Sequence, residues 1–87
     1  MIKAGKTYQT VSGLPVRIIS IDAKIGPHKT DEGRLKMYQI VALIRKYDEE
    51  LDLDYDFIDW YSFDDYNKVT GVLQSVTKDS YDIVVKD

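Results

Sequence analysis

The feature that most constrains the fold is a strict alternation of apolar and acidic side chains near the middle of the chain. The alternating residues are Leu51, Asp52, Leu53, Asp54, Tyr55, Asp56 and Phe57. Neighbouring side chains of a β-strand point to opposite faces, so the pattern predicts a half-buried strand with one acidic face. Two apolar residues then follow each other at Phe57 and Ile58, which predicts a β-bulge before the alternation resumes at Trp60.

Extended structure is also expected in most of the remaining chain. The other segments whose composition favours strands are 8–11, 16–22, 36–46, 72–76 and 81–85. Segment 16–22 is rich in β-branched residues, and the last two segments alternate. Segment 36–46 has a competing interpretation as a helix, because Ile40, Leu43 and Ile44 fall on one helical stripe. Its β-branched content and its short length favour a strand.

Turn signals divide these segments into a meander of five or six strands. Residues 12–15, 48–50, 64–67 and 77–80 have turn compositions, and residues 23–35 are expected to form a long loop. The first two strands and the last two are expected to form hairpins. The expected fold is therefore mainly β: one domain, residues 1–87, forming a small, SH3-like, partly open antiparallel barrel of five or six strands.

Length and composition narrow the class of protein. A chain of 87 residues suits one domain, and the absence of cysteine excludes disulfides and cysteine-based zinc sites. No apolar run is long enough to cross a membrane, and the N-terminus lacks the apolar stretch of a signal peptide. We therefore expect a cytoplasmic protein without a membrane partner.

The charge is distributed unevenly along the chain. Residues 1–46 carry nine Lys/Arg and three Asp/Glu, whereas residues 47–87 carry three and twelve, so the two halves have charges of +6 and −9. Such a dipolar surface suits self-association into a homo-oligomer, or an anion bound on the basic side. The pI near 5.0 argues against direct binding of nucleic acid.

The sequence offers little for catalysis. Nucleophilic catalysis needs a Cys, Ser or Lys beside a base, but the chain has no Cys and its single histidine, His28, lies in the expected loop. There is no phosphate-binding loop and no dinucleotide-binding motif. We expect no catalytic residues, no cofactor and no enzymatic activity.

A metal site is not expected either. Asp52, Asp54 and Asp56 resemble the start of a calcium-binding EF-hand loop. The match then fails, because Phe57 stands where glycine is needed and Phe63 stands where Glu is needed. A solvated strand face explains the three carboxylates.

The number of aromatic residues favours a binding function. Seven tyrosines and one tryptophan are many for this length, and both types suit ligand faces and interfaces. For Trp60, core and interface are equally compatible with the sequence; Tyr8 and Tyr38 are expected at the surface. Arg17, with Thr10 expected across the same hairpin, offers a guanidinium and a hydroxyl to a phosphate, although a solvated Arg17 explains the pattern too. The expected ligand-binding residues are Tyr8, Thr10, Arg17, Lys24, His28, Tyr38, Trp60 and Tyr61.

One motif begins with Gly5-Lys6-x-Tyr8-x-Thr10-x-x-Gly13-x-x-x-Arg17-Ile18-x-x-x-Asp22 and continues with Tyr38-Gln39-Ile40-Val41-Ala42-Leu43-Ile44. Looser matches follow at Trp60-Tyr61-Ser62-Phe63-Asp64-Asp65 and at Tyr81-Asp82-Ile83-Val84. Through these residues, most of the chain resembles small bacteriophage accessory proteins. The chain departs from the family pattern at Gln39, where the family has proline, at Asp65, where it has glycine, and in its longer loop at 23–35. The resemblance implies an SH3-like barrel, and some compact phage proteins of this kind sequester cyclic nucleotide immune signals as homo-oligomers.

Three functional hypotheses follow. The first is a non-enzymatic, phage-encoded binding protein that sequesters a small anionic ligand such as a cyclic nucleotide, as an anti-defence sponge in the host cytoplasm. The second is a protein-binding inhibitor that uses the acidic face of residues 48–65, either as a nucleic-acid mimic or as an antagonist of a host protein. The third is an enzyme that degrades the ligand, which predicts new products after incubation.

Overall fold

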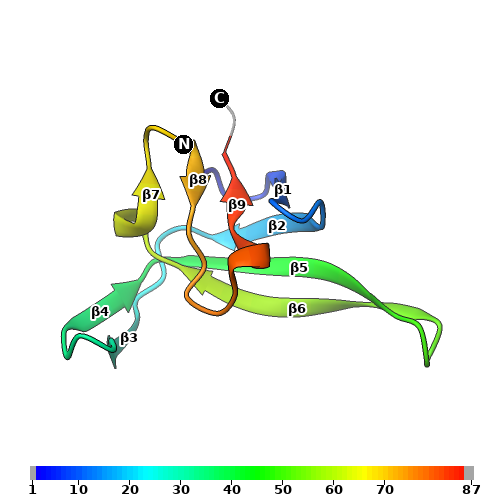
Figure 1. Cartoon of the computed structure of the whole chain (residues 1–87), viewed down its shortest axis with the longest axis horizontal. Helices are drawn as coiled ribbons and strands as arrows, with labels where there is room; N and C mark the ends of the chain where they lie inside the picture. Colours follow the sequence, from blue (N-terminus) through cyan, green and yellow to red (C-terminus); the bar gives the residue numbers. More distant parts are fainter. Residues whose placement is uncertain (1, 86–87) are drawn as a thin grey trace.

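The computed structural model describes residues 2–85 and contains two antiparallel β-sheets (Figure 1). The larger sheet has seven strands in the order β6-β5-β2-β1-β9-β8-β7, and the smaller one pairs β3 with β4. The strands are β1 (Thr7–Thr10), β2 (Pro15–Ser20), β3 (Ile25–Lys29), β4 (Leu35–Tyr38), β5 (Ile40–Asp48), β6 (Leu53–Tyr61), β7 (Tyr66–Asn67), β8 (Val72–Leu73) and β9 (Ile83–Val84). Two short 3₁₀ helices, η1 (Phe63–Asp65) and η2 (Asp79–Tyr81), complete the described chain. The prediction of a mainly β protein is confirmed.

The larger sheet is open but strongly curled. Its two edge strands, β6 and β7, follow each other in the chain and are joined by η1. Figure 1 shows β7, β8 and β9 standing across the β2-β5-β6 layer, so the sheet folds back over its own core. Residues 2–85 form no closed barrel, and the seven-stranded sheet plus a hairpin exceeds the predicted five or six strands.

The core lies between these two parts of the sheet. Its fully buried side chains come from strands at both ends of the strand order; they are Val16, Ile18, Ile40, Ala42, Ile44, Tyr61, Leu73 and Ile83. Burial alternates along β2 and β5, as expected for strands that cover a core with one face. The helical alternative for 36–46 is therefore wrong.

The β5–β6 hairpin is the longest element of the fold. It pairs Ile40 with Tyr61 at one end and Asp48 with Leu53 at the other, without a register shift. The predicted bulge at Phe57 and Ile58 is wrong, because Ile58 is apolar yet 55% exposed on the outer face of the sheet. Two neighbouring apolar residues can therefore keep regular strand geometry.

Two predicted segments have different structures. The expected loop 23–35 contains β3 and the first residue of β4, which pair through His28 with Lys36 and Lys29 with Leu35. Segment 36–46 is not one strand, because the chain breaks at Gln39 between β4 and β5. The hairpin expected near the C-terminus is present, although β8 and β9 are only two residues each.

Within residues 2–85, no helix has the length and apolarity needed to cross a membrane.

Candidate functional site

The eight residues expected to bind a ligand do not gather in one place. Tyr8 and Thr10 lie on β1, and Arg17 and Trp60 lie on the outer face of β2 and β6. Lys24, His28 and Tyr38 lie in or beside the β3–β4 hairpin. The eighth, Tyr61, is fully buried in the core, where its hydroxyl donates to the carbonyl oxygen of Tyr81 at 2.6 Å. Burial, reinforced by the charge of Asp59, raises the pKa of Tyr61 far above its ordinary value.

The two predicted residues on β1 have structural contacts. Tyr8 is buried, contrary to the expected surface position, and its hydroxyl accepts a hydrogen bond from the backbone N–H of Lys3 at 3.0 Å. Thr10 is also buried, and its hydroxyl accepts from the N–H of Leu14 at 3.0 Å. Because both hydroxyl groups have hydrogen-bond partners inside the protein, Tyr8 and Thr10 can be buried.

Arg17 lies at the surface, but without the predicted partner. It is exposed on β2, opposite Thr7 on β1 and Leu43 on β5. Thr10 is buried on the core side, so the two side chains do not face one ligand. Trp60 shares the outer face with Arg17 and is 40% exposed, which places it at the surface rather than in the core.

The remaining predicted residues surround the β3–β4 hairpin. Lys24 and His28 are exposed, and the His28 ring lies 5.7 Å from the ring of Tyr38. Tyr38 is only 7% exposed, so the expectation that it lies at the surface is wrong. This pair of tilted rings therefore belongs largely to the packing of the hairpin.

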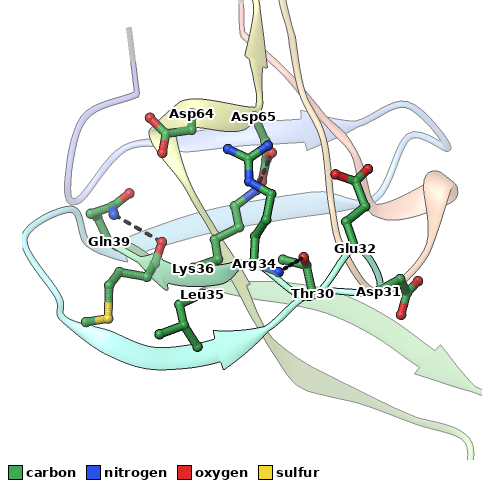
Figure 2. A pocket seen from close by; sticks show the side chains of 10 residues that line it. Thr30, Asp31, Glu32, Arg34, Leu35, Lys36, Gln39, Asp64 and Asp65 are labelled. Carbon is green, nitrogen blue, oxygen red and sulfur yellow. Dashed lines mark hydrogen bonds and ion pairs between the residues drawn. The ribbon is translucent and has the colours of Figure 1, made fainter.

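A hollow of about 660 Å³ lies between the β3–β4 hairpin and η1, and we call it the hairpin pocket (Figure 2). Its lining residues are Thr30, Asp31, Glu32, Arg34, Leu35, Lys36, Met37, Gln39, Asp64 and Asp65. Lys36 forms an ion pair with Asp65 at 2.5 Å, and the other carboxylate oxygen of Asp65 is buried without a hydrogen-bond partner in residues 2–85. Four carboxylates against two cations make this lining unfavourable for an anion.

A second hollow, of about 590 Å³, follows β1, and we call it the β1 groove. Its lining residues are Lys6, Thr7, Tyr8, Gln9, Thr10, Val11, Gly13, Pro15 and Val84. Among residues 2–85, Lys6 is the one charged residue of this lining, and its ammonium group lies 5.5 Å from the centre of the Tyr8 ring. The β1 groove therefore carries positive charge and contains two of the residues expected from the sequence.

The part of the β5–β6 hairpin beyond the core, residues 47–56, forms what we call the acidic arm. Figure 1 shows it projecting to the right of the body. Its carboxylates are Asp48, Glu49, Glu50, Asp52, Asp54 and Asp56. Among them, and within residues 2–85, only Asp56 has an ion-pair partner, Arg45 at 2.7 Å. The hydrogen bond from Arg45 lowers the pKa of Asp56 below its ordinary value.

The tip of the acidic arm is ordered by its own hydrogen bonds. The Asp48 carboxylate accepts from the N–H groups of Glu50 at 2.9 Å and Leu51 at 3.0 Å. Tyr47 donates its hydroxyl to Asp52, which has a positive φ of 50°. The arm also exposes apolar surface, with Leu51 67%, Leu53 45% and Tyr55 39% exposed. Both faces of the strand are therefore accessible here, whereas the sequence predicts one buried face.

Within residues 2–85, no group of three or more side chains is placed to hold a metal ion. Comparison of the chain with protein families, curated proteins and solved structures finds no match. The functional argument therefore depends on the surfaces described above.

Proposed function

We propose that this chain is a non-enzymatic binding protein that holds a basic surface of a partner protein with its acidic arm. The observation that carries the proposal is a set of carboxylates, all but Asp56 without an ion-pair partner within residues 2–85, on a hairpin that extends beyond the core. Carboxylates in this position attract a basic partner over a distance, and the exposed Leu51, Leu53 and Tyr55 supply apolar contact area. The proposal corresponds to an inhibitor that imitates nucleic acid or antagonises a host protein.

A charge-reversal experiment tests this function. Glu49→Lys, Glu50→Lys and Asp54→Lys change three arm carboxylates that make no side-chain hydrogen bond or ion pair within residues 2–85. A matched control reverses three carboxylates outside the arm: Asp31→Lys, Glu32→Lys and Asp79→Lys. The probe is a fluorescent decalysine peptide at low salt. We expect the arm variant to lose binding and the control to retain it, and equal loss in both would reduce the effect to net charge and contradict the proposal.

The β1 groove supports a second candidate, the sequestration of a small anionic ligand such as a cyclic nucleotide. The supporting observation is that its described lining residues include Lys6 and no carboxylate, with Tyr8 beside it. A phosphate requires such a cation, and an aromatic ring suits a base. In this version the chain is a homo-oligomeric phage sponge in the host cytoplasm. Isothermal titration with a panel of cyclic nucleotides tests it: heat that is lost in Lys6→Ala supports it, and no heat with any member removes it.

We also propose that the curled sheet of this chain is an SH3-like barrel. An SH3-like barrel is supported by the chain path, because η1 carries the chain directly from edge strand β6 to edge strand β7. An experimental structure that superposes on SH3-like barrels strand by strand would establish it. A flat sheet without this curl would exclude it.

A further inference from the structure

Within residues 2–85, the outer edge of β6, a strand of nine residues, pairs with no other strand. β6 ends the strand order of the larger sheet, and its ladder with β5 occupies only one of its two edges. The opposite edge of the sheet, β7, has two residues. A long free edge presents backbone N–H and C=O groups that can pair with another extended chain.

The hydrogen-bond pattern shows which residues face this edge. The backbone N–H of Ile18 donates to the carbonyl oxygen of Lys6, just before β1. The backbone N–H and C=O of Ile18 therefore point toward β1, and those of its neighbour Arg17 point toward β5. Arg17 pairs with Leu43, which therefore faces β2, and so Ala42 faces β6, where it pairs with Asp59. Backbone groups alternate between the two edges of a strand. The odd-numbered residues of β6 consequently face β5, and its even-numbered residues face the free edge.

A contact at the end of the strand agrees with this assignment. The N–H of Trp60 donates to the carboxylate of Asp59 at 2.9 Å, so it is already satisfied away from β5. That carboxylate is fixed by the hydroxyls of Ser75 at 3.0 Å and Thr77 at 2.9 Å. Within residues 2–85, no side chain accepts a hydrogen bond from the N–H groups of Asp54, Asp56 and Ile58, and no strand pairs with this edge. The free edge therefore runs from Asp54 to Ile58.

The same even-numbered residues place their side chains on the exposed outer face. Along the edge they run acidic, acidic, apolar, apolar: Asp54, Asp56, Ile58 and Trp60. Ile58 is 55% exposed and Trp60 is 40% exposed. An added strand would place alternate side chains beside these four, and charge complementarity requires basic residues next to the two carboxylates.

This pattern disfavours a second copy of the same edge as the occupant. Two β6 edges that pair antiparallel about a two-fold axis along the whole segment from Asp54 to Ile58 place Asp54 or Asp56 against another carboxylate, or against Ile58 or Trp60. Each register therefore buries an uncompensated charge or sets like charges opposite each other. A basic extended segment avoids both costs.

We propose that the β6 edge accepts an extended segment of a partner protein as an additional antiparallel strand, with two basic and two apolar side chains at alternate positions. The inference deepens the proposed function and depends on it, because it names how the basic partner is held. Backbone pairing from Asp54 to Ile58 provides affinity, and the alternate side chains provide the recognition.

The probe for this proposal is a synthetic peptide, Val-Thr-Val-Thr-Lys-Thr-Lys, which matches the edge in the antiparallel direction. Its control has the same sequence but carries N-methyl groups on the backbone amides that face β6. Loss of these donors should weaken binding at least about tenfold, since two or more hydrogen bonds are removed. Chemical shifts of labelled protein should move at the even-numbered residues of β6.

Protein variants separate edge pairing from charge attraction. Ile58→Pro removes an edge-facing N–H and leaves the ladder with β5 intact, whereas Ile58→Thr keeps the N–H and removes most of the apolar contact. We expect the proline variant to bind about tenfold more weakly than the threonine variant, with thermal melting confirming that both are folded. If Ile58→Pro does not fold, the comparison with the N-methylated peptide decides.

The outcomes distinguish this inference from the proposed function. Equal binding of the methylated and unmethylated peptides, with loss in the arm charge-reversal variant, would overturn edge pairing and leave the acidic arm as a binding surface. Absence of binding by both peptides and by decalysine would overturn both proposals. Weakening by methylation and by Ile58→Pro supports the edge.

Discussion

The two halves of the β5–β6 hairpin share one continuous ladder and differ in almost everything else. In the inner half, Ile40, Ala42 and Ile44 of β5 are fully buried. In the outer half, Leu53 and Tyr55 of β6 are about 40% exposed or more, although they continue the same inward-facing row. The hydrogen bonds of a ladder are therefore compatible with a core and with an exposed arm. What differs is whether the curled strands β7 to β9 lie above.

The boundary between the halves is marked by Lys46. Its ammonium group donates to the hydroxyl of Tyr81 at 2.5 Å and lies 5.8 Å from the centre of the Phe57 ring. This hydrogen bond raises the pKa of Lys46 above its ordinary value. The Lys46 side chain thus bridges the hairpin and η2 at the border of the core. It leaves no buried charge there, because its ammonium group stays close to solvent.

The largest expected difference concerns apolar residues in the two halves. Ile44→Ala removes a fully buried side chain and should lower the free energy of unfolding by about 2–5 kcal/mol. Leu53→Ala, in the same ladder, should lower it by less than about 1 kcal/mol, because Leu53 is 45% exposed. Urea denaturation of the two variants measures both values. Similar losses would show that the arm packs against something in solution and would break the comparison.

A smaller difference is expected between two tyrosine hydroxyls. Tyr61→Phe leaves the buried carbonyl oxygen of Tyr81 without its donor and should cost about 1–3 kcal/mol. Tyr47→Phe removes an exposed hydrogen bond to Asp52 at the tip of the arm and should cost less than about 0.5 kcal/mol. Thermal unfolding of the two variants gives the comparison, and a larger effect at Tyr47 would contradict it.

The smallest effect concerns the pH dependence of two carboxylates. Partial burial raises the pKa of Asp82 above its ordinary value, so between the two values the folded state binds more protons than the unfolded state. Stability from this group therefore falls as the pH rises through that window, and Asp82→Asn should remove the fall. The amide oxygen of Asn can still accept the hydrogen bond that Ser75 N–H donates at 2.7 Å.

Asp56 on the arm should show the opposite sign. The hydrogen bond from Arg45 lowers its pKa, so its contribution is present above the ordinary value and is lost as the pH falls through the lowered one. Stability curves of the wild type, Asp82→Asn and Asp56→Asn between pH 3 and pH 7 test the two signs. Parallel curves for all three proteins would refute the assignment.

The sequence predicted the elements that have a strong two-residue pattern and missed those without one. β6 was predicted from its alternation, and the first and last hairpins from their turns. β3 was missed because Ile25–Lys29 has no buried face, so its pairing with β4 leaves no periodic apolar signal. Tyr8 was placed at the surface because nothing in the sequence shows that Lys3 satisfies its hydroxyl.

The candidate surfaces were predictable only in part. The acidic residues of 48–65 were visible in the sequence, but the prediction that they form one surface is wrong, because only those up to Asp56 lie on the arm and Asp59 is buried. The free edge of β6 depends on the strand order, which is set by two-residue strands such as β8 and β9 and by the distant pairing of β1 with β9. Pairings of that length and separation leave almost no local signal. The hairpin pocket was missed because it joins residues 30–39 to η1.

Amide hydrogen exchange along β6, followed residue by residue by NMR, tests the free edge most directly. The amides of Tyr55 and Phe57 bond to β5 and should be protected, whereas those of Asp54, Asp56 and Ile58 should exchange at least about tenfold faster. Trp60 is the expected exception, because its N–H is held by Asp59. Uniform protection along the strand would mean that the outer edge is already paired, and the account of a docking edge would be wrong.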